Sequence, residues 1–345
     1  MLTRRTALLS AAALTGSALA VSTAYADDTE AQLYEAAKKE GHVTWYSGYM
    51  NQPMCEAIAQ AFTQKYPGIR VDATKTTSEV AFQRVMQDIN ASTVQSDLFS
   101  STDSSHMAYL IGKDKLVKYT PPNASALVPA LRDFNGGGYY FPGWVGLVAL
   151  MYNTKGVSAA DAPKDWPDLA NPKWKNKIAF GSPNYSGLVA TWVVGMTQKF
   201  GWDFFEKLNA LDPLIGRSID DAVAVLNAGE RQVAICSAAS ALRSGATGNP
   251  IAVNYATSFS LVDFSPVAIL KGSPSPNAAK LLFNFMAGPE YSQILAKNYE
   301  QPLRSDVPPP KGAKSLAELT LYQPSVEDVI KMLPDLKNKW RDTFG

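Results

Sequence analysis

Hydroxyl-bearing residues and glycines gather at five places where a strand is expected to end and a helix to begin. A helix N-terminus there offers unpaired N–H groups and a positive dipole end, and ligands of open α/β sheets bind outside the carboxyl ends of the strands. The pattern favours a cleft for a small anion or a polar solute with a carboxylate or phosphoryl group. The candidate binding residues are Ser47, Gly48, Thr77, Ser78, Ser101, Thr102, Ser182, Ser186, Gly187, Ser237 and Ser240. Each hydroxyl also has a simpler explanation, because Ser and Thr are favoured N-caps for helix stability alone.

Two arginines and a further serine could contribute to the same cleft. Ser218 is expected to cap a helix over residues 220–227, and Arg217 directly precedes it. Arg243 falls within the helix that Ser237 opens. Either arginine could supply a counter-charge to an anion, or could simply be solvated at the surface, where arginines usually lie.

Aromatic residues and one acid complete the candidate set. Tyr49, Trp144 and Tyr185 could form the walls around an organic ligand, or could pack in the protein interior. Asp263 interrupts an otherwise apolar run, SLVDFSPVAIL. Its carboxylate could accept a hydrogen bond from a ligand amine or hold a contact within a hinge.

The elements that position these residues alternate between strand and helix. Short apolar runs at residues 42–48, 69–73 and 97–99 predict strands, with helical spacing of apolar residues between them. The same order returns after residue 178, where IAF precedes a long apolar helix and QVAICS ends at Ser237. The sequence therefore predicts two α/β units, each a mixed, mostly parallel sheet flanked by helices.

Two apolar segments are placed to cross between these units. VGLVALMYN, residues 145–153, would carry the chain over, and residues 260–270 would bring it back, after which a helix over 276–298 packs on the first unit. Two crossings make a two-strand hinge. The predicted organisation is lobe 1 over 27–143 plus 262–305 and lobe 2 over 144–261 plus 306–345.

Composition excludes several classes of function. The 345 residues carry 32 basic and 31 acidic side chains, so the formal charge of +1 gives no reason to expect a nucleic-acid partner. Two histidines and two cysteines leave few residues for zinc sites, thiol relays or histidine-based catalysis. We therefore expect a protein that binds no cofactor or metal and is not an enzyme. Cys55 and Cys236 could pair after export, but buried free thiols are the simpler interpretation.

The first 26 residues have the features of an export signal. Arg4 and Arg5 precede an apolar stretch, and Ala24 and Ala26 flank Tyr25 before Asp27, which predicts cleavage after Ala26. The paired arginines suit a twin-arginine leader, while an ordinary secretory signal remains the alternative. The predicted mature chain is a periplasmic monomer with 30 basic and 31 acidic groups.

Several segments together resemble periplasmic solute-binding proteins of ABC importers, closest to the ferric-ion-binding branch and its organic-solute relatives. These segments are WYSG, AFTQKYPGIRV, SDLFSST, VALMYN, NPKWKNKIAF and AVLNAGERQVAI. The resemblance covers nearly all of the mature chain. It implies a type II periplasmic-binding-protein fold, in which two lobes close on one ligand that is then delivered to a membrane permease.

The resemblance does not extend to the iron ligands. Where iron-binding members have a histidine, a glutamate and a tyrosine pair, this chain has Met50, Thr102, and Ala239 with Ser240. Ferric ion is a hard cation that needs anionic oxygen or imidazole donors. The anion-coordinating positions of that branch, by contrast, match Ser186 to Leu188, Ser218 and Ser237. We therefore expect a metal-free organic solute with a phosphate, phosphonate or carboxylate group.

Other functions remain as alternatives to test. An exported hydrolase would need a nucleophile with a base, and no G-x-S-x-G elbow occurs in the sequence. An iron binder with an atypical ligand set, a polyamine or thiamine type of binder, and a module that serves a chemoreceptor would all use the same cleft.

Overall fold

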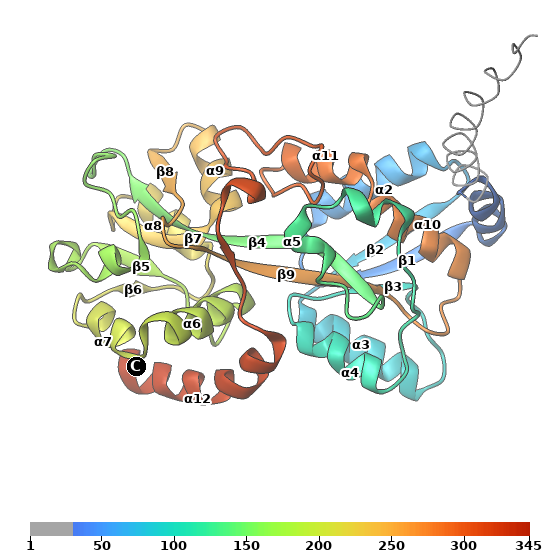
Figure 1. Ribbon diagram of the computed structural model, residues 1–345, viewed down its shortest axis with the longest axis horizontal. Helices are drawn as coiled ribbons and strands as arrows, with labels where there is room; N and C mark the ends of the chain where they lie inside the picture. Colours follow the sequence, from blue (N-terminus) through green and yellow to red (C-terminus); the bar gives the residue numbers. More distant parts are fainter. Residues whose placement is uncertain (1–29) are drawn as a thin grey trace, which may run out of the picture.

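The computed structural model describes residues 30–345, and the predicted export signal lies outside them. Figure 1 shows two α/β lobes side by side, joined by two long strands, β4 and β9. Within the described residues the strands form one path in the order β2-β1-β3-β9-β4-β7-β5-β6, with β10 paired to β9 and β8 paired to β4. The predicted fold class, two lobes with a two-strand hinge, is confirmed by this topology. Among residues 30–345 no helix is both long and apolar enough to span a membrane.

The first lobe is built on three parallel strands and the helices between them. Residues 30–40 are helical. Then follow β1 (His42–Ser47), α2 (Gln52–Lys65), β2 (Arg70–Lys75), α3 (Ser78–Asn90), β3 (Leu98–Ser100) and α4 (Ser104–Gly112). Polar caps start the helices, because Asn51 accepts from the Met54 N–H and Asp103 from the Ser105 N–H. The cap of α3 is Thr77, whose side chain accepts from the Val80 N–H.

The second lobe repeats the alternation. Its elements are β5 (Ile178–Phe180), α6 (Gly187–Phe200), α7 (Asp203–Asn209), β6 (Leu214–Ile215), α8 (Asp221–Asn227), β7 (Val233–Ser237), α9 (Ala238–Ala246) and β8 (Ile251–Asn254). β5 pairs parallel with both β6 and β7. The carboxyl ends of β5 and β7 are therefore on the same edge of the sheet, as the sequence predicts.

The first crossing strand is longer than the apolar run that indicates it, and the second matches its run to within one residue. β4 covers Tyr140–Asn153 and β9 covers Ser260–Ile269, and they pair antiparallel from Tyr140 to Leu147. The sequence places the start of β4 at Val145, because Pro142 and Gly143 resemble the end of a loop. The structure accommodates both residues through a register shift between Pro142 and Trp144. A bulge is the usual place for proline and glycine inside a sheet.

The chain after the hinge returns to the first lobe and then leaves it. One continuous helix over 276–298 was the wrong expectation, since Gly288 and Pro289 separate α10 (Pro276–Met286) from α11 (Pro289–Lys297). α12 (Val326–Phe344) packs on α6 and α7. The remaining short elements are η1 (Pro122–Ala126), α5 (Pro129–Arg132), η2 (Trp166–Ala170), η3 (Pro172–Trp174), η4 (Leu316–Glu318) and β10 (Leu321–Tyr322).

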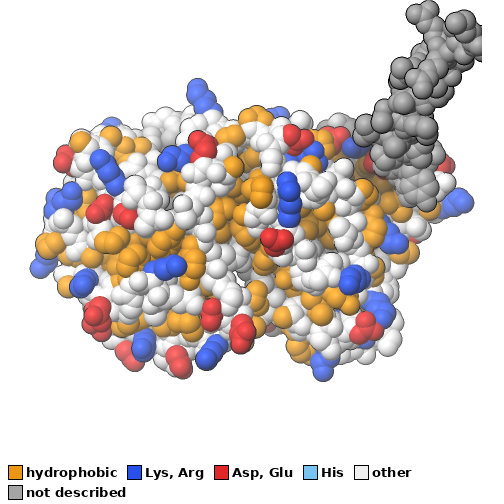
Figure 2. Space-filling model, in the orientation of Figure 1, with side chains coloured by type: hydrophobic (Ala, Val, Ile, Leu, Met, Phe, Trp, Pro, Cys, Tyr) orange, Lys and Arg blue, Asp and Glu red, His pale blue; other side chains and the backbone are white. Residues whose placement is uncertain are grey.

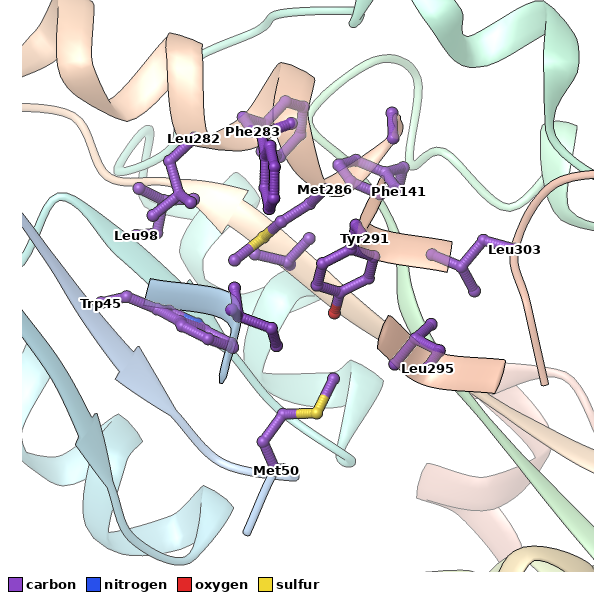
Figure 3. Packing of buried hydrophobic residues seen from close by; sticks show 14 of the residues in the cluster. Trp45, Met50, Leu98, Phe141, Leu282, Phe283, Met286, Tyr291, Leu295 and Leu303 are labelled. Carbon is purple, nitrogen blue, oxygen red and sulfur yellow. The ribbon is translucent and has the colours of Figure 1, made fainter. Parts of the chain in front are cut away.

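Each lobe has its own large hydrophobic core. In the first, Trp45 of β1, Phe283 of α10 and Tyr291 of α11 belong to one buried cluster, part of which Figure 3 shows. In the second, Trp192 of α6 and Trp340 of α12 are buried in one cluster. Leu316 belongs to the first cluster, so the C-terminal segment still contacts lobe 1 after residue 306. The exact lobe boundaries stay a prediction.

Candidate functional site

A cleft of about 320 Å³ lies where the two lobes face each other. The carboxyl ends of β1 and β3 reach it from lobe 1, and the N-termini of α6 and α9 reach it from lobe 2. Candidate residues that line it are Gly48, Tyr49, Thr102, Trp144, Tyr185, Ser186, Gly187, Ser218, Ser237, Ser240 and Arg243. The expected convergence of the junctions is therefore present, while ligand binding by these side chains stays a prediction.

Ser186 and Gly187 form the N-terminus of α6 and line the cleft. The Ser186 hydroxyl caps the helix by accepting from the Val189 N–H at 3.4 Å. A Cβ added to Gly187 would lie 3.3 Å from Thr102 Oγ1, so the two lobes approach each other here. The free N–H groups at the start of a 14-residue helix thus face the opposite lobe, which suits an anion between them.

Ser237 presents a hydroxyl that its own helix does not use. It occupies the N-cap position of α9 but makes no side-chain capping hydrogen bond, and it lines the cleft at the end of β7. An N-cap hydroxyl without this bond contributes little to helix stability. Ser237 is therefore free to bond a ligand.

Arg243 lines the cleft with its side chain 36% exposed and is anchored there by hydrogen bonds. Its Nη1 donates to Glu300 Oε1 at 2.8 Å, and its Nη2 donates to Ser240 Oγ at 3.0 Å. Trp144 Nε1 donates to the other carboxylate oxygen of Glu300 at 3.0 Å. Burial raises the pKa of Glu300, although Arg243 opposes that rise. The Arg243 guanidinium is therefore already paired with a buried carboxylate, which weakens its attraction for an anionic ligand.

Ser218 and Arg217 border the cleft on the lobe 2 side. Ser218 Oγ donates to Asp221 Oδ1 at 2.7 Å and accepts from the Asp221 N–H, but the N-cap position of α8 is Asp220 rather than Ser218, the predicted cap. Hydrogen bonds from Ser218 hold the pKa of Asp221 below its usual value. Arg217 is exposed, outside the cleft lining, and lies 5.1 Å from the ring centre of Tyr185. The pair places a cation and an aromatic face at the rim.

Several candidate hydroxyls sit behind the cleft instead of lining it. Ser78 Oγ donates to the Gly48 carbonyl at 3.1 Å and accepts from the Thr102 N–H at 2.9 Å. Only glycine fits at position 48, because a Cβ there would come within 2.6 Å of the Ser100 carbonyl oxygen. Ser78 thus positions Gly48 and Thr102, two of the lobe 1 residues that line the cleft.

The remaining candidates off the cleft have structural partners or are buried. Thr77 caps α3, Ser182 Oγ accepts from the Asn184 N–H at 3.3 Å, and Ser47 is fully buried. Asp263 lines an adjoining compartment of the same interlobe gap. Cys55 and Cys236 are buried free thiols.

Ser101 forms a serine–histidine pair that resembles a catalytic arrangement. Its Oγ lies 2.9 Å from His106 Nδ1, and Glu79 Oε2 lies 3.4 Å from His106 Nε2. Ser101 is fully buried, however, and its Oγ also accepts from the Asp103 N–H. The His106 ring stacks on Phe82, and burial lowers its pKa. The pair therefore holds the turn before α4.

Aromatic side chains form one wall of the cleft. The Tyr49 and Trp144 rings stack with centroids 6.1 Å apart and planes at 15°. Tyr185 is 67% exposed on the opposite lobe. Tyr49 and Trp144 therefore form an aromatic wall on the hinge side of the cleft. Tyr185 lies at the rim on the other side.

Sequence reasoning left part of the lining out of its candidate set. The additional lining residues are Met50, Asn51, Met54, Leu188, Ile219, Asp220 and Glu300, of which Met50 and Leu188 were named only as counterparts of the related branch's metal and anion positions. Most of them directly follow a junction already identified, so neighbourhood along the chain could have found them. Glu300 follows α11, 57 residues after its partner Arg243, and no local pattern marks it.

The chain belongs to the bacterial extracellular solute-binding protein family, whose model matches residues 43–299. A Salmonella typhimurium relative, provisionally named as a 2-aminoethylphosphonate-binding periplasmic protein, is 24% identical over 293 residues, covering 72% of this chain and 86% of its own. The resemblance inferred from the sequence motifs is thus confirmed.

Solved structures share the fold. Iron-bound HitA from Pseudomonas aeruginosa is 23% identical with a TM-score of 0.72, covering 86% of this chain and 98% of its own. The periplasmic binding protein AfuA from Actinobacillus pleuropneumoniae, with fructose-6-phosphate bound, is 22% identical with a TM-score of 0.73, covering 88% and 98%. At these identities the likeness concerns the fold, and it confirms the type II architecture.

Proposed function

We propose that this protein is the periplasmic receptor of an ABC importer and captures a small organic solute by its anionic group between the two lobes. The observation that carries the proposal is the meeting of the α6 N-terminus, the unused Ser237 hydroxyl and Ser218 in one cleft with Thr102 of the other lobe. Helix N-termini and hydroxyls bind anions without a metal. The closed state gains stability from a ligand that touches both lobes.

The related proteins favour a phosphorus oxyanion over a carboxylate. One relative is named for 2-aminoethylphosphonate, and a structural neighbour was solved with fructose-6-phosphate. Both compounds present a tetrahedral group with several acceptor oxygens, which several hydroxyl and N–H donors can surround. We propose a phosphonate or phosphate ester as the solute, with no chemical conversion of it.

The partners and location follow from the same role. The mature protein, after cleavage at Ala26, would act as a monomer in the periplasm and deliver its solute to a membrane permease. Nucleic acid has no part in this function. The nearly neutral charge of the chain is consistent with a partner recognised by shape and local contacts.

A thermal-shift and calorimetric screen tests the proposal. Phosphonates, phosphate esters, carboxylates and polyamines are compared, each with and without ferric salts. At about 100 times its dissociation constant, a one-site ligand stabilises the folded protein by roughly 2.7 kcal/mol. Stabilisation only by ferric ion, with a tyrosinate-to-iron colour, would replace the proposal with iron binding.

Two capping serines provide a matched pair of variants. Ser186 and Ser325 both cap helices, through the Val189 N–H and the Asp328 N–H, but only Ser186 lines the cleft. We expect Ser186→Ala and Ser325→Ala to lose similar stability, about 1 kcal/mol each. Only Ser186→Ala should weaken solute binding. Equal affinity in both variants would show that the anion lies elsewhere.

A further inference from the structure

A second compartment of about 240 Å³ adjoins the cleft. It lies between α4, α6 and α12, and Figure 2 shows a notch at the lower edge of the molecule, where Figure 1 draws α12 opposite α3 and α4. Thr102, Tyr185, Ser186 and Gly187 line both spaces. The N-terminus of α6 therefore borders both the cleft and this compartment.

Asp263 lines this compartment from the hinge strand β9. Its side chain is buried, with the residue 4% exposed, and it pairs in register with Gly146 of β4. Within residues 30–345 the one hydrogen bond to its carboxylate comes from Ser265 Oγ, to Oδ2 at 3.2 Å. A buried carboxylate is stable when a cation or several donors compensate it. Asp263 has capacity for a further donor on Oδ1.

The other charges in the compartment favour a cation near Asp263. Asp103, the N-cap of α4, also lines the space, and its charge adds to the rise in the pKa of Asp263. Lys337 of α12 is the lining residue with a positive charge. A ligand ammonium would thus meet two carboxylates, one of them desolvated, where a Coulomb attraction is strong.

The two acids of the main cleft are less suited to this role. Glu300 already accepts from Arg243 and Trp144. Asp220 is exposed to solvent at the rim, where an ion pair is screened and contributes little. Asp263, by contrast, is buried and has a carboxylate oxygen, Oδ1, that can accept a hydrogen bond from a ligand.

We propose that the solute is bipolar, with its anionic group at the N-terminus of α6 and an ammonium group bound by Asp263. The inference rests on the proposed function and narrows it to short amino-phosphonates or amino-phosphate esters. Ser186 and Gly187 line the same compartment as Asp263, so the groups proposed to bind the anion and the ammonium border one space. An uncharged tail in place of the ammonium would leave the Asp263 carboxylate buried without a counter-ion.

Isothermal titration with pairs of matched ligands tests this assignment. 2-Aminoethylphosphonate is compared with propylphosphonate, and β-alanine with butyrate, because each pair differs by an ammonium in place of a methyl group. We expect wild-type protein to prefer the ammonium member of a pair by tenfold or more. Asp263→Asn should reduce the preference to below threefold while the affinity for the methyl member changes by less than threefold.

The outcomes separate the inference from the function. If an anion binds without preference for the ammonium, or if Asp263→Asn weakens both members equally, the bipolar assignment is wrong and the anion receptor stands. If Asp220→Asn abolishes the preference and Asp263→Asn keeps it, the rim carboxylate holds the ammonium instead. If no anion in either pair binds to the wild type, the proposed function fails, and the inference fails with it. Retained binding of the methyl member shows that Asp263→Asn is folded.

Discussion

Replacing Asp263 with asparagine should make the ligand-free protein more stable at high pH. Desolvation in the hinge raises the pKa of Asp263 from 3.8 to about 7. At about 1.36 kcal/mol per pKa unit, this shift corresponds to about 4 kcal/mol of destabilisation once the carboxylate is ionised. The value is an upper limit, because a hinge can admit water, and we expect at least about 1 kcal/mol.

The sign of the effect follows from which state binds the proton more tightly. Below pH 3.8 the carboxyl is neutral in both the folded and unfolded states, so the wild type carries no penalty. As the pH rises from about 4 to 7, the folded wild type holds a proton that the unfolded chain has lost, and its stability falls. Asparagine does not titrate, so the advantage of Asp263→Asn should grow through this window and level off above pH 7.

Urea unfolding at half-unit steps between pH 4.5 and 8 measures this difference. The comparison with wild type cancels the titration of other groups, and Asp220→Asn provides a control for loss of an exposed charge at the same interlobe gap. Each transition must be cooperative for the free energies to be comparable. A stability difference that stays constant across the range would refute the burial of an unpaired carboxylate in the hinge.

Three further outcomes follow from the site. Gly187→Ala should weaken solute binding tenfold or more by calorimetry, because its Cβ would lie 3.3 Å from Thr102 Oγ1 in the gap, and unchanged affinity would place the anion away from α6. Arg243→Met should lower the free energy of unfolding by about 2 kcal/mol because Glu300 loses its counter-ion, and adding Glu300→Gln should restore part of it; the absence of any rescue contradicts the pairing. The preference for an ammonium-bearing solute should fall from pH 8 to pH 5.5 as Asp263, beside Asp103 and Lys337, takes up a proton; a preference independent of pH would remove Asp263 from the ammonium site.

The local part of the site could be predicted because strand ends and helix starts are encoded within a few residues. Ser237 ends an apolar run, Ser186 stands directly before one, and both occupy N-cap positions in the structure. The sheet topology then brings them together without any further signal from the sequence. Gly288 and Pro289 mark the break between α10 and α11, so the sequence does contain a signal for the end of α10. The apolar periodicity that continues on both sides of the break favoured one continuous helix instead.

The non-local part could not be predicted from one sequence. From the sequence alone, Arg243 could be solvated or paired with an acid. The structure decides between these, because the loop after α11 brings Glu300 to Arg243. Ser78 and Ser101 have the residue types of ligand contacts, yet tertiary hydrogen bonds to Gly48 and His106 use them inside lobe 1. Which hydroxyl faces the gap depends on side-chain direction at each turn, which composition and spacing do not specify.

The hinge and the binding chemistry are linked through Asp263. An ionised carboxylate in β9 disfavours the ligand-free protein, and the same charge favours any state in which a cation lies beside it. Thr102 and Gly187 come from different lobes and line both compartments, so a solute with its anion at α6 and its cation at Asp263 would contact both lobes. A ligand can shift the equilibrium between open and closed states only through interactions that differ between them. A bipolar solute provides such interactions at both ends, whereas a simple anion leaves the hinge carboxylate as it is in the empty protein.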